Sequence, residues 1–282
     1  MREKLHIVSI SDTHGRLKST NIPPCDVVTM SGDFSALRND RMIDKNGPLC
    51  KWITNKFIPW LLSMPCDRVI FIPGNHDFIT EEPWFEQWFY EKLHAFDEYY
   101  IGAKDNPCKP SEKIVYLCEQ TYTYKGWTFY GCPYSDIRGW AWSAQGNYKK
   151  YFVPEGVDVL LVHQAPDWME LGTSTFEHGL KRNFGSSVLM NALHRWQERL
   201  PKLLLCGHIH SGNHLPIIYD VWDDDDRKHS IMMVNVSTKN EDYQEYFYPR
   251  HFELQEDKES LIIDTYVTSQ NNEKINEERF IL

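Results

Sequence analysis

Hydrophobic residues occur in short runs along the chain, and each run ends on polar residues. Runs of this length, rich in branched side chains and closed by turn-forming residues, are typical of buried strands. We therefore predict strands at residues 5–11, 26–31, 68–72, 157–162 and 202–206.

Hydrophobic residues recur at helical spacing in three of the segments between these runs. Residues 49–64 form the first predicted helix, and Pro59 would kink or divide it because proline lacks an amide donor. The second predicted helix covers residues 83–96. The third covers residues 186–200, with Ser186 as the N-cap residue.

Other parts of the chain indicate antiparallel strands. Residues 114–134 are rich in β-branched and aromatic residues around a tight Lys125-Gly126 turn. Residues 217–268 contain several more strand-like segments separated by polar turns. Residues 223–226 are four consecutive aspartates, which we interpret as a solvated hairpin tip rather than a calcium loop.

These elements together predict an α/β fold of mixed type, with a two-sheet β-sandwich flanked by helices. No repeat or flexible linker divides the chain. We therefore expect a single domain over residues 1–270 and a polar C-terminal tail over residues 271–282, extended or helical at the surface. The polar residues after the strands would lie at the carboxyl edge of a sheet, where α/β proteins place their sites.

Composition narrows the classes of function. The chain of 282 residues carries a formal net charge of −10, which disfavours broad contact with the backbone of duplex DNA. Its seven cysteines are odd in number and have no C-x-x-C spacing, so neither a disulfide framework nor a zinc ribbon is expected. The N-terminus leaves no room for a signal peptide, and no hydrophobic run is long enough to span a membrane. We expect a reduced, cytoplasmic protein.

Five clusters of metal-ligating residue types follow the predicted strands. Each alone has a simple structural interpretation: an Asp after Gly is often a turn residue, and a lone His is often a hydrogen-bonded surface residue. Gathered from five places, however, such oxygen and nitrogen donors suggest a two-metal site that would polarise a phosphoester. The clusters are Asp12-Thr13-His14, Gly32-Asp33, Gly74-Asn75-His76-Asp77, His163 and Gly207-His208-Ile209-His210.

In this order the clusters resemble the signature blocks of the calcineurin-like metallophosphoesterase superfamily, D-x-H, G-D, G-N-H-D/E, H and G-H-x-H. The resemblance extends from about Leu5 to Ser237, with no ligand substituted. Other matches resemble one branch, the metallophosphoesterase-domain-containing proteins and related class III cyclic-nucleotide phosphodiesterases. They lie at residues 11–14, 32–35, 131–134 with Gly139-Trp140, 207–210 and 234–237.

The resemblance implies a role for each donor. Asp12, His14 and His210 would hold one divalent metal ion, Asn75, His163 and His208 the other, and Asp33 would bridge both. Mixed carboxylate and imidazole ligands suit Mn²⁺, the expected metal, or Fe, Zn, Ni or Mg in its place.

The resemblance also implies a mechanism. A hydroxide held by both metals would attack phosphorus in line, with Asp33 as a catalytic bridge. His76 matches the family's non-ligand histidine and would act as the general acid for the leaving group. Its neighbour Asp77 would either orient a histidine or stabilise a turn.

Three residues are expected to contact the substrate. Besides Asn75, we select Arg138 and Trp140, because they lie in an aromatic and basic stretch, residues 134–152, that could stack on a base and meet phosphate. The alternative is a surface loop whose rings pack on the sandwich. In residues 167–184 we interpret His178 as a surface histidine, while His214 could support a ligand or lie exposed.

The expected function is hydrolysis of a small phosphodiester, including cyclic nucleotides, or a phosphomonoester. One alternative is a nuclease of the same fold, which the net charge disfavours. Another is a metal-binding but inactive interaction scaffold, which would be expected to have lost ligands. A protein phosphatase would be expected to continue Gly32-Asp33 as GDxxDRG, and this chain does not.

Overall fold

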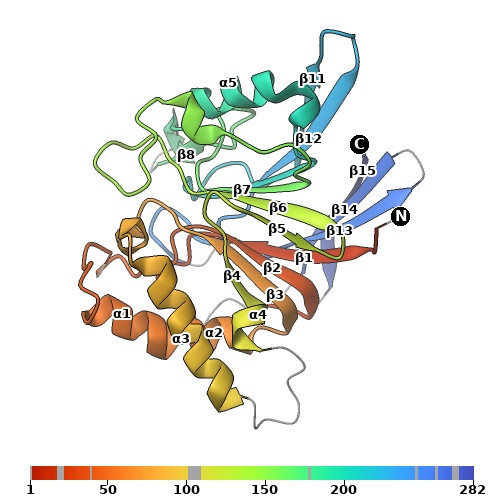
Figure 1. Cartoon of the computed structure of the whole chain (residues 1–282). Coiled ribbons are helices and arrows are strands. Elements are labelled where there is room, and N and C mark those ends of the chain that lie inside the picture. The colour runs from red at the N-terminus through yellow and green to blue at the C-terminus, as the bar shows by residue number, and fades with distance from the viewer. Residues whose placement is uncertain are drawn as a thin grey trace.

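Two β-sheets stack face to face in the computed structural model, and helices cover their outer faces (Figure 1). The structure describes residues 2–17, 22–38, 40–100, 109–176, 179–244, 247–257, 260–268 and 273–282. This arrangement confirms the predicted α/β sandwich flanked by helices.

The first sheet is 7-stranded and mixed. Its strands β1 to β4 run parallel, as in the predicted α/β part of the chain, and β13 joins β1 in the antiparallel sense. Its spatial order is β15 (Lys274–Ile281), β14 (Ser260–Thr268), β13 (Arg250–Asp257), β1 (Leu5–Ile10), β2 (Cys25–Ser31), β3 (Cys66–Ile72) and β4 (Ile114–Tyr116).

The second sheet is 6-stranded, with parallel central strands and an antiparallel strand at each edge. Its order is β11 (Ile217–Trp222), β12 (Lys228–Asn235), β10 (Leu203–Cys206), β7 (Val159–Val162), β6 (Trp127–Cys132) and β5 (Thr121–Tyr124). A separate two-stranded hairpin, β8 (Thr173–Thr175) and β9 (Lys181–Asn183), lies outside both sheets.

Helices pack on both outer faces. The first sheet is covered by α1 (Pro48–Trp52), α2 (Ile58–Ser63) and α3 (Phe85–Tyr100), and the second by α5 (Ser187–Trp196) (Figure 1). The shorter helices are α4 (Pro110–Lys113) and 3₁₀ turns at Phe78–Glu81, Tyr148–Tyr151 and Gln197–Arg199. None of the helices in the described ranges is both long and apolar enough to span a bilayer.

The strand alternation explains the layers. In β1, Leu5 and Ile7 point into the core between the sheets, while Val8 and Ile10 point into the core beneath the helices. Successive side chains of a strand face opposite sides, so a strand covered on both faces reads as a continuous hydrophobic run.

The three predicted helices are present, although α3 continues to Tyr100 and α5 ends at Trp196. Ser186 caps α5, because its hydroxyl accepts a hydrogen bond of 2.9 Å from the amide of Leu189. The first predicted helix is continuous from α1 to α2 but contains a π-helical turn, Ile53–Phe57, directly before Pro59. The wider turn accommodates a proline, which cannot donate to the preceding helical turn.

One sequence prediction needs correction. We expected antiparallel strands throughout residues 114–134, but only β5 and β6 form an antiparallel hairpin, around Lys125-Gly126. The segment that begins the range, β4, pairs in parallel with β3 in the other sheet. Hydrophobic alternation does not distinguish a hairpin from a segment that crosses between sheets, since both bury alternate residues.

Two polar segments also have defined places. The four aspartates at residues 223–226 occupy the turn between β11 and β12, where Asp223 accepts hydrogen bonds from the amides of Asp225 and Arg227. Lys274–Ile281 pairs with β14 as the edge strand β15.

Candidate metal centre

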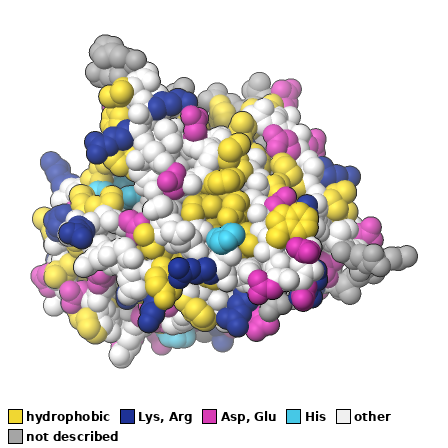
Figure 2. All heavy atoms as spheres, turned by 90° about the horizontal axis from the view of Figure 1, so that it is seen from above, with side chains coloured by type: hydrophobic (Ala, Val, Ile, Leu, Met, Phe, Trp, Pro, Cys, Tyr) yellow, Lys and Arg dark blue, Asp and Glu magenta, His cyan; other side chains and the backbone are white. Residues whose placement is uncertain are grey.

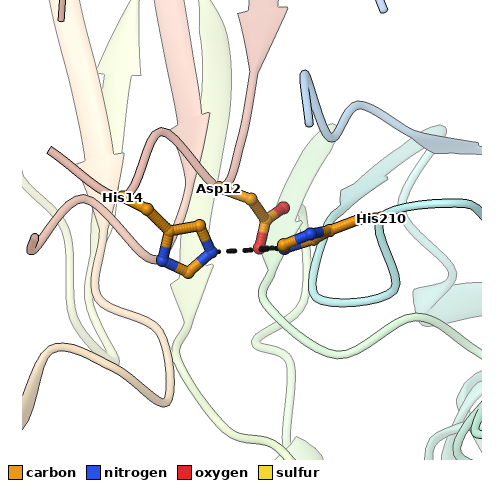
Figure 3. Close-up of side chains that lie close together, drawn as sticks. All are labelled: Asp12, His14 and His210. Carbon is orange, nitrogen blue, oxygen red and sulfur yellow. Dashed lines mark hydrogen bonds and ion pairs between the residues drawn. The ribbon is translucent and has the colours of Figure 1, made fainter. Parts of the chain in front are cut away.

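Three buried side chains from the ends of β1 and β10 point toward one another (Figure 3). Asp12 and His14 follow β1, and His210 lies in the loop after β10. The Nε2 atoms of His14 and His210 are 3.2 Å apart, and Nε2 of His210 lies 3.6 Å from Oδ1 of Asp12. These three donors can converge on one cation.

A second group of donors comes from the ends of β2, β3, β7 and β10. Asp33, His163 and His208 each offer a ligand atom within 4.8 Å of the others. The Oδ1 atom of Asn75 lies 2.8 Å from Nε2 of His163. The structure therefore brings all seven sequence-predicted donors to one edge of the sandwich.

Asp33 lies between the two groups. Its Oδ1 atom is 3.4 Å from Nε2 of His163, and its Oδ2 atom is 3.8 Å from Nε2 of His14. Each carboxylate oxygen thus faces a histidine of a different group.

The spacing of these donors fits divalent cations. Nitrogen and oxygen ligands bind such ions at about 2.0–2.2 Å, which places neighbouring ligand atoms on one ion about 3 Å apart. The separations of 3.2 Å between His14 and His210 and of 2.8 Å between His163 and Asn75 are of this size. The donor set, imidazoles with carboxylates and an amide oxygen, suits transition-metal ions.

Backbone hydrogen bonds fix the outer nitrogens of two of the imidazoles. Nδ1 of His163 lies 2.8 Å from the carbonyl oxygen of Ser31, and Nδ1 of His210 lies 3.0 Å from that of Asn240. When Nδ1 donates to a carbonyl, the lone pair of a neutral imidazole lies on Nε2, which here faces the other donors.

Burial and charge prepare the donors for cations. Burial lowers the pKa of His14 and that of His208 to about 3, so both imidazoles are neutral and can bind metal. Burial alone would raise the pKa of Asp12, but the hydrogen bond and charge of His210 hold it below its usual value. Although burial opposes it, the charge of Asp33 raises the pKa of His163 to about 9. A proton on His163 offsets the negative charge of Asp33, which a bound cation would otherwise neutralise.

The motif glycines permit this close packing. A Cβ atom at Gly74 would collide with Oδ1 of Asp33, and one at Gly207 would collide with Oδ2 of Asp12. Neither carboxylate can move away without leaving the site, because each is a candidate metal ligand.

The backbone is also unusual where it carries the donors. Asp12, His14, Asp33 and His208 have φ angles of 58°, 45°, 54° and 70°, in the left-handed region that non-glycine residues seldom occupy. Such conformations cost free energy and cluster at functional sites, where the surrounding fold enforces them. Here they turn side chains from consecutive strand ends toward one point.

His76 lies beside the donors. Its amide donates a 2.8 Å hydrogen bond to Oδ1 of Asp33, and its ring meets that of His14 edge-on at 5.0 Å. Nδ1 of His76 is 2.8 Å from Oδ2 of Asp40. The sequence analysis missed Asp40, because no spacing rule connects it to His76.

Comparison with known proteins agrees with this geometry. A family model described as calcineurin-like phosphoesterase matches residues 5–212. The chain belongs to the calcineurin-like phosphoesterase family. Membership in this family and the donor groups together support the binding of divalent metal ions. The superfamily expected from the five clusters is thereby confirmed.

The relatives also confirm the expected branch. Metallophosphoesterase domain-containing protein 1 of Homo sapiens is 30% identical over 219 residues, which cover 73% of this chain and 60% of that protein. A UPF0046 protein of Caenorhabditis elegans, C25E10.12, is 28% identical over 216 residues, or 73% of this chain and 69% of that protein. The chain thus spans only part of the length of these relatives.

Two solved structures are similar at low identity. A 5′-nucleotidase precursor from Thermus thermophilus is 10% identical with a TM-score of 0.39, and the match covers 99% of this chain and 54% of that chain. A conserved uncharacterized protein from Streptococcus pneumoniae, a predicted phosphoesterase, is 12% identical with a TM-score of 0.35, and the match covers 100% of both chains.

Within this family member, Asp77 stabilises a turn. Its carboxylate accepts hydrogen bonds from the amides of Gly74 and Ser35, each 2.8 Å, and from that of Phe34 at 3.3 Å. These bonds tie the loop of Asp33 to the loop of Asn75. Of the two roles left open by the sequence, the contacts of Asp77 match the turn.

A cavity of about 470 Å³ opens beside the candidate metal ligands. Trp140 lines it and packs on His76 with ring centroids 4.4 Å apart. Arg138, the other predicted contact from this stretch, is exposed and is not among the described lining residues. The chain turns sharply at Gly139 between the two, so neighbouring residues end on different surfaces.

Part of residues 134–152 packs on the body of the protein, whereas residues 145–150 are exposed. Tyr151 is fully buried, and Nζ of Lys150 donates a 3.0 Å hydrogen bond to the Tyr134 hydroxyl. His178 lies outside the described residues. His214 supports a donor segment, because its Nε2 atom is 2.9 Å from the carbonyl oxygen of His210.

The sequence analysis also missed Tyr243. Its ring lines the cavity and meets the rings of His14 and His210 edge-on at 4.9 Å and 5.1 Å. Tyr243 lies in the loop after β12, which carries no motif that relates it to the first strand.

Proposed function

We propose that this protein hydrolyses a small phosphodiester or phosphomonoester with two divalent cations that share Asp33. The observation that carries the proposal is the position of Asp33, whose two oxygens face His163 of one donor group and His14 of the other. Asp12, His14 and His210 would hold the first cation. Asn75, His163 and His208 would hold the second.

When bound, the two cations would supply Lewis acidity, which lowers the pKa of an attacking water and neutralises charge on the phosphoryl oxygens. Mn²⁺ is the metal that we propose first, with Fe, Zn, Ni or Mg in its place. The amide of Asn75 lies at the mouth of this centre, where Nδ2 can donate to a phosphoryl oxygen.

His76 would supply the proton that the leaving oxygen needs. Asp40 accepts from Nδ1, so the second ring nitrogen, Nε2, is free to carry a proton toward the cavity that His76 lines. Transfer of this proton to the ester oxygen avoids release of an unstable alkoxide. Asp40 is the positioning residue, since it fixes the ring and its tautomer.

The cavity favours a small substrate. Its volume of about 470 Å³ suits a nucleotide-sized ligand, including a cyclic nucleotide. The net charge of −10 disfavours a nuclease that follows a duplex. On the face that Figure 2 shows, basic side chains are interspersed with acidic ones.

We also propose a cytoplasmic location. Support comes from the seven cysteines of the sequence, which are odd in number and have no C-x-x-C spacing, so that a disulfide framework is not expected.

An assay of the Mn²⁺-loaded protein tests the proposed function. It compares bis-p-nitrophenyl phosphate, p-nitrophenyl phosphate, and 2′,3′- and 3′,5′-cyclic nucleotides, with bound metal counted by elemental analysis. We expect turnover of at least one ester, lost in the Asp33→Asn variant. Two bound metals without turnover of any ester would contradict the proposal and favour an interaction scaffold.

A further inference from the structure

One wall of the cavity is built from exposed aromatic rings. Phe176 and Phe184, at the two ends of the β8–β9 hairpin, line the cavity and are 43% and 39% exposed. Their centroids are 6.1 Å apart in an edge-to-face arrangement. Ile137, 36% exposed, and Trp140 extend the wall toward His76. Large apolar groups left open beside a metal centre point to an apolar ligand.

The residue that follows β9, Phe184, is fixed to a segment of the candidate metal centre. Gln164, the neighbour of His163, is buried and donates a 3.1 Å hydrogen bond from Nε2 to the carbonyl oxygen of Phe184. Its Oε1 atom accepts a 3.0 Å bond from the amide of Asp136, next to Ile137. One side chain thus connects two parts of the wall to a donor segment.

The other strand of the hairpin is fixed as well. Glu241 accepts hydrogen bonds of 2.6 Å and 2.7 Å from the hydroxyls of Ser174 and Ser211. Ser211 is the neighbour of His210, so this bond network holds β8 against the first donor group. The rings are therefore part of a preformed wall.

The wall offers little to a second anion. None of the lining residues that the structure describes is Lys or Arg, whereas Asp136 and Glu241 are acidic. Two nearby guanidinium groups stack on lining rings: Arg41 lies 4.8 Å from the Trp140 centroid and Arg182 lies 4.9 Å from that of Phe184. Neither arginine is among the described lining residues, so a further phosphate seated on the lining would meet carboxylates and rings.

We propose that the substrate carries an uncharged aromatic or apolar group on an ester oxygen, and that this group packs on Phe176 and Phe184. The inference rests on the proposed function, because it assumes that the phosphoryl group occupies the metal centre. It names the substrate class: esters with one phosphoryl group and an uncharged aromatic or apolar alcohol, and not polyphosphates.

Calorimetric titration of the Mn²⁺-loaded full chain tests this without relying on turnover. Methylphosphonate, phenylphosphonate and 4-carboxyphenylphosphonate present the same phosphonate with a small, an aromatic and an anionic aromatic group. We expect phenylphosphonate to bind about tenfold more tightly than methylphosphonate, because rings gain from burial and edge contacts. The added carboxylate should remove most of that gain.

Variants of the two phenylalanines test whether these rings cause the difference between the phenyl and the methyl affinity. Phe176→Ala and Phe184→Ala should each reduce the ratio of the phenyl to the methyl affinity by at least threefold. Phe152→Ala is the matched control, since Phe152 is 55% exposed and is not among the described lining residues, and it should keep the ratio. Equal affinities for methyl- and phenylphosphonate, no binding of either, or an unchanged ratio in both lining variants would overturn the inference.

The two proposals fail differently. If phosphonates bind with the expected ratio but no ester is hydrolysed, the proposed hydrolysis is wrong and the aromatic wall stands. If esters are hydrolysed but the ratio is absent, only the inferred substrate class is wrong.

Discussion

Nδ1 of His76 lies 2.8 Å from Oδ2 of Asp40, in a pair that borders the carboxylate of Asp33. Both side chains are largely buried, with 12% of each exposed. A carboxylate behind an imidazole fixes its tautomer and supports the charge that the ring carries as an acid. This carboxylate partner distinguishes His76 from His163 and His210, whose Nδ1 atoms face backbone carbonyl oxygens.

We expect His76→Ala to lower kcat by about 10²–10⁴-fold, the usual contribution of general acid catalysis. The loss should be larger for alkyl esters than for p-nitrophenyl esters, since a good leaving group needs less protonation. Steady-state kinetics across both ester types measures this, with metal content checked by elemental analysis. A loss that is equal for all leaving groups would contradict the assignment of His76 as the acid.

Replacing Asp40 tests whether this carboxylate supports proton transfer by His76 without binding metal or substrate itself. Asp40→Asn should lower kcat by about tenfold while KM and the bound metal stay unchanged, because the ring keeps its place but loses its carboxylate partner. The leaving-group dependence should steepen as in His76→Ala. Unaltered kinetics would show that the pair does not support catalysis.

For Asp77→Asn we expect the main loss in stability, whereas for Asp40→Asn we expect it in kcat. The carboxylate accepts from three backbone amides, and an asparagine side chain would leave at least one of them unpaired or facing its own NH₂ group. We expect the free energy of unfolding to fall by about 1–3 kcal/mol in urea titrations. Below its unfolding temperature, the variant should keep more kcat than Asp40→Asn. The reverse order of kcat would return Asp77 to a histidine-orienting role.

The pH dependence of stability should include His251. Its Nδ1 atom is 3.0 Å from Nε2 of His6, its Nε2 atom is 2.7 Å from the Thr268 hydroxyl, and burial lowers its pKa to about 4. The unfolded chain binds this proton near pH 6.5, so stability is lost as the pH falls from about 6.5 toward 4. The shift corresponds to roughly 3 kcal/mol.

Other buried histidines titrate in the same window, so the comparison is between variants. Urea unfolding of metal-free wild type and of His251→Phe at pH 7.5 and pH 4.5 isolates the contribution of His251. We expect the variant to lose less stability on acidification than the wild type. An equal loss in the two proteins would rule out this contribution.

Local sequence patterns were sufficient for the framework and the donors. Each donor follows a hydrophobic strand, and parallel strands bring their carboxyl ends to one edge, so Asp12 and Asp33, which follow two such strands, could be placed together without a structure. The pairing of β4 with β3 could not be predicted from the sequence, because burial patterns carry no information on which sheet a strand joins.

The surroundings of the donors depended on contacts between distant loops. Asp40, Tyr243 and the two hairpin rings, Phe176 and Phe184, belong to segments whose spacing carries no periodic signal. Arg138 and Trp140 are near neighbours in sequence, yet only Trp140 lines the cavity. Loop geometry is set by particular hydrogen bonds, such as those of Gln164, which a single sequence does not reveal.

The most direct test of the central claim is anomalous diffraction at the manganese edge from crystals of the Mn²⁺-loaded protein. We predict two peaks about 3.5–4 Å apart, with one oxygen of Asp33 on each ion, His14 on the first and His163 on the second. A single peak, or two peaks that do not share Asp33, would contradict the account.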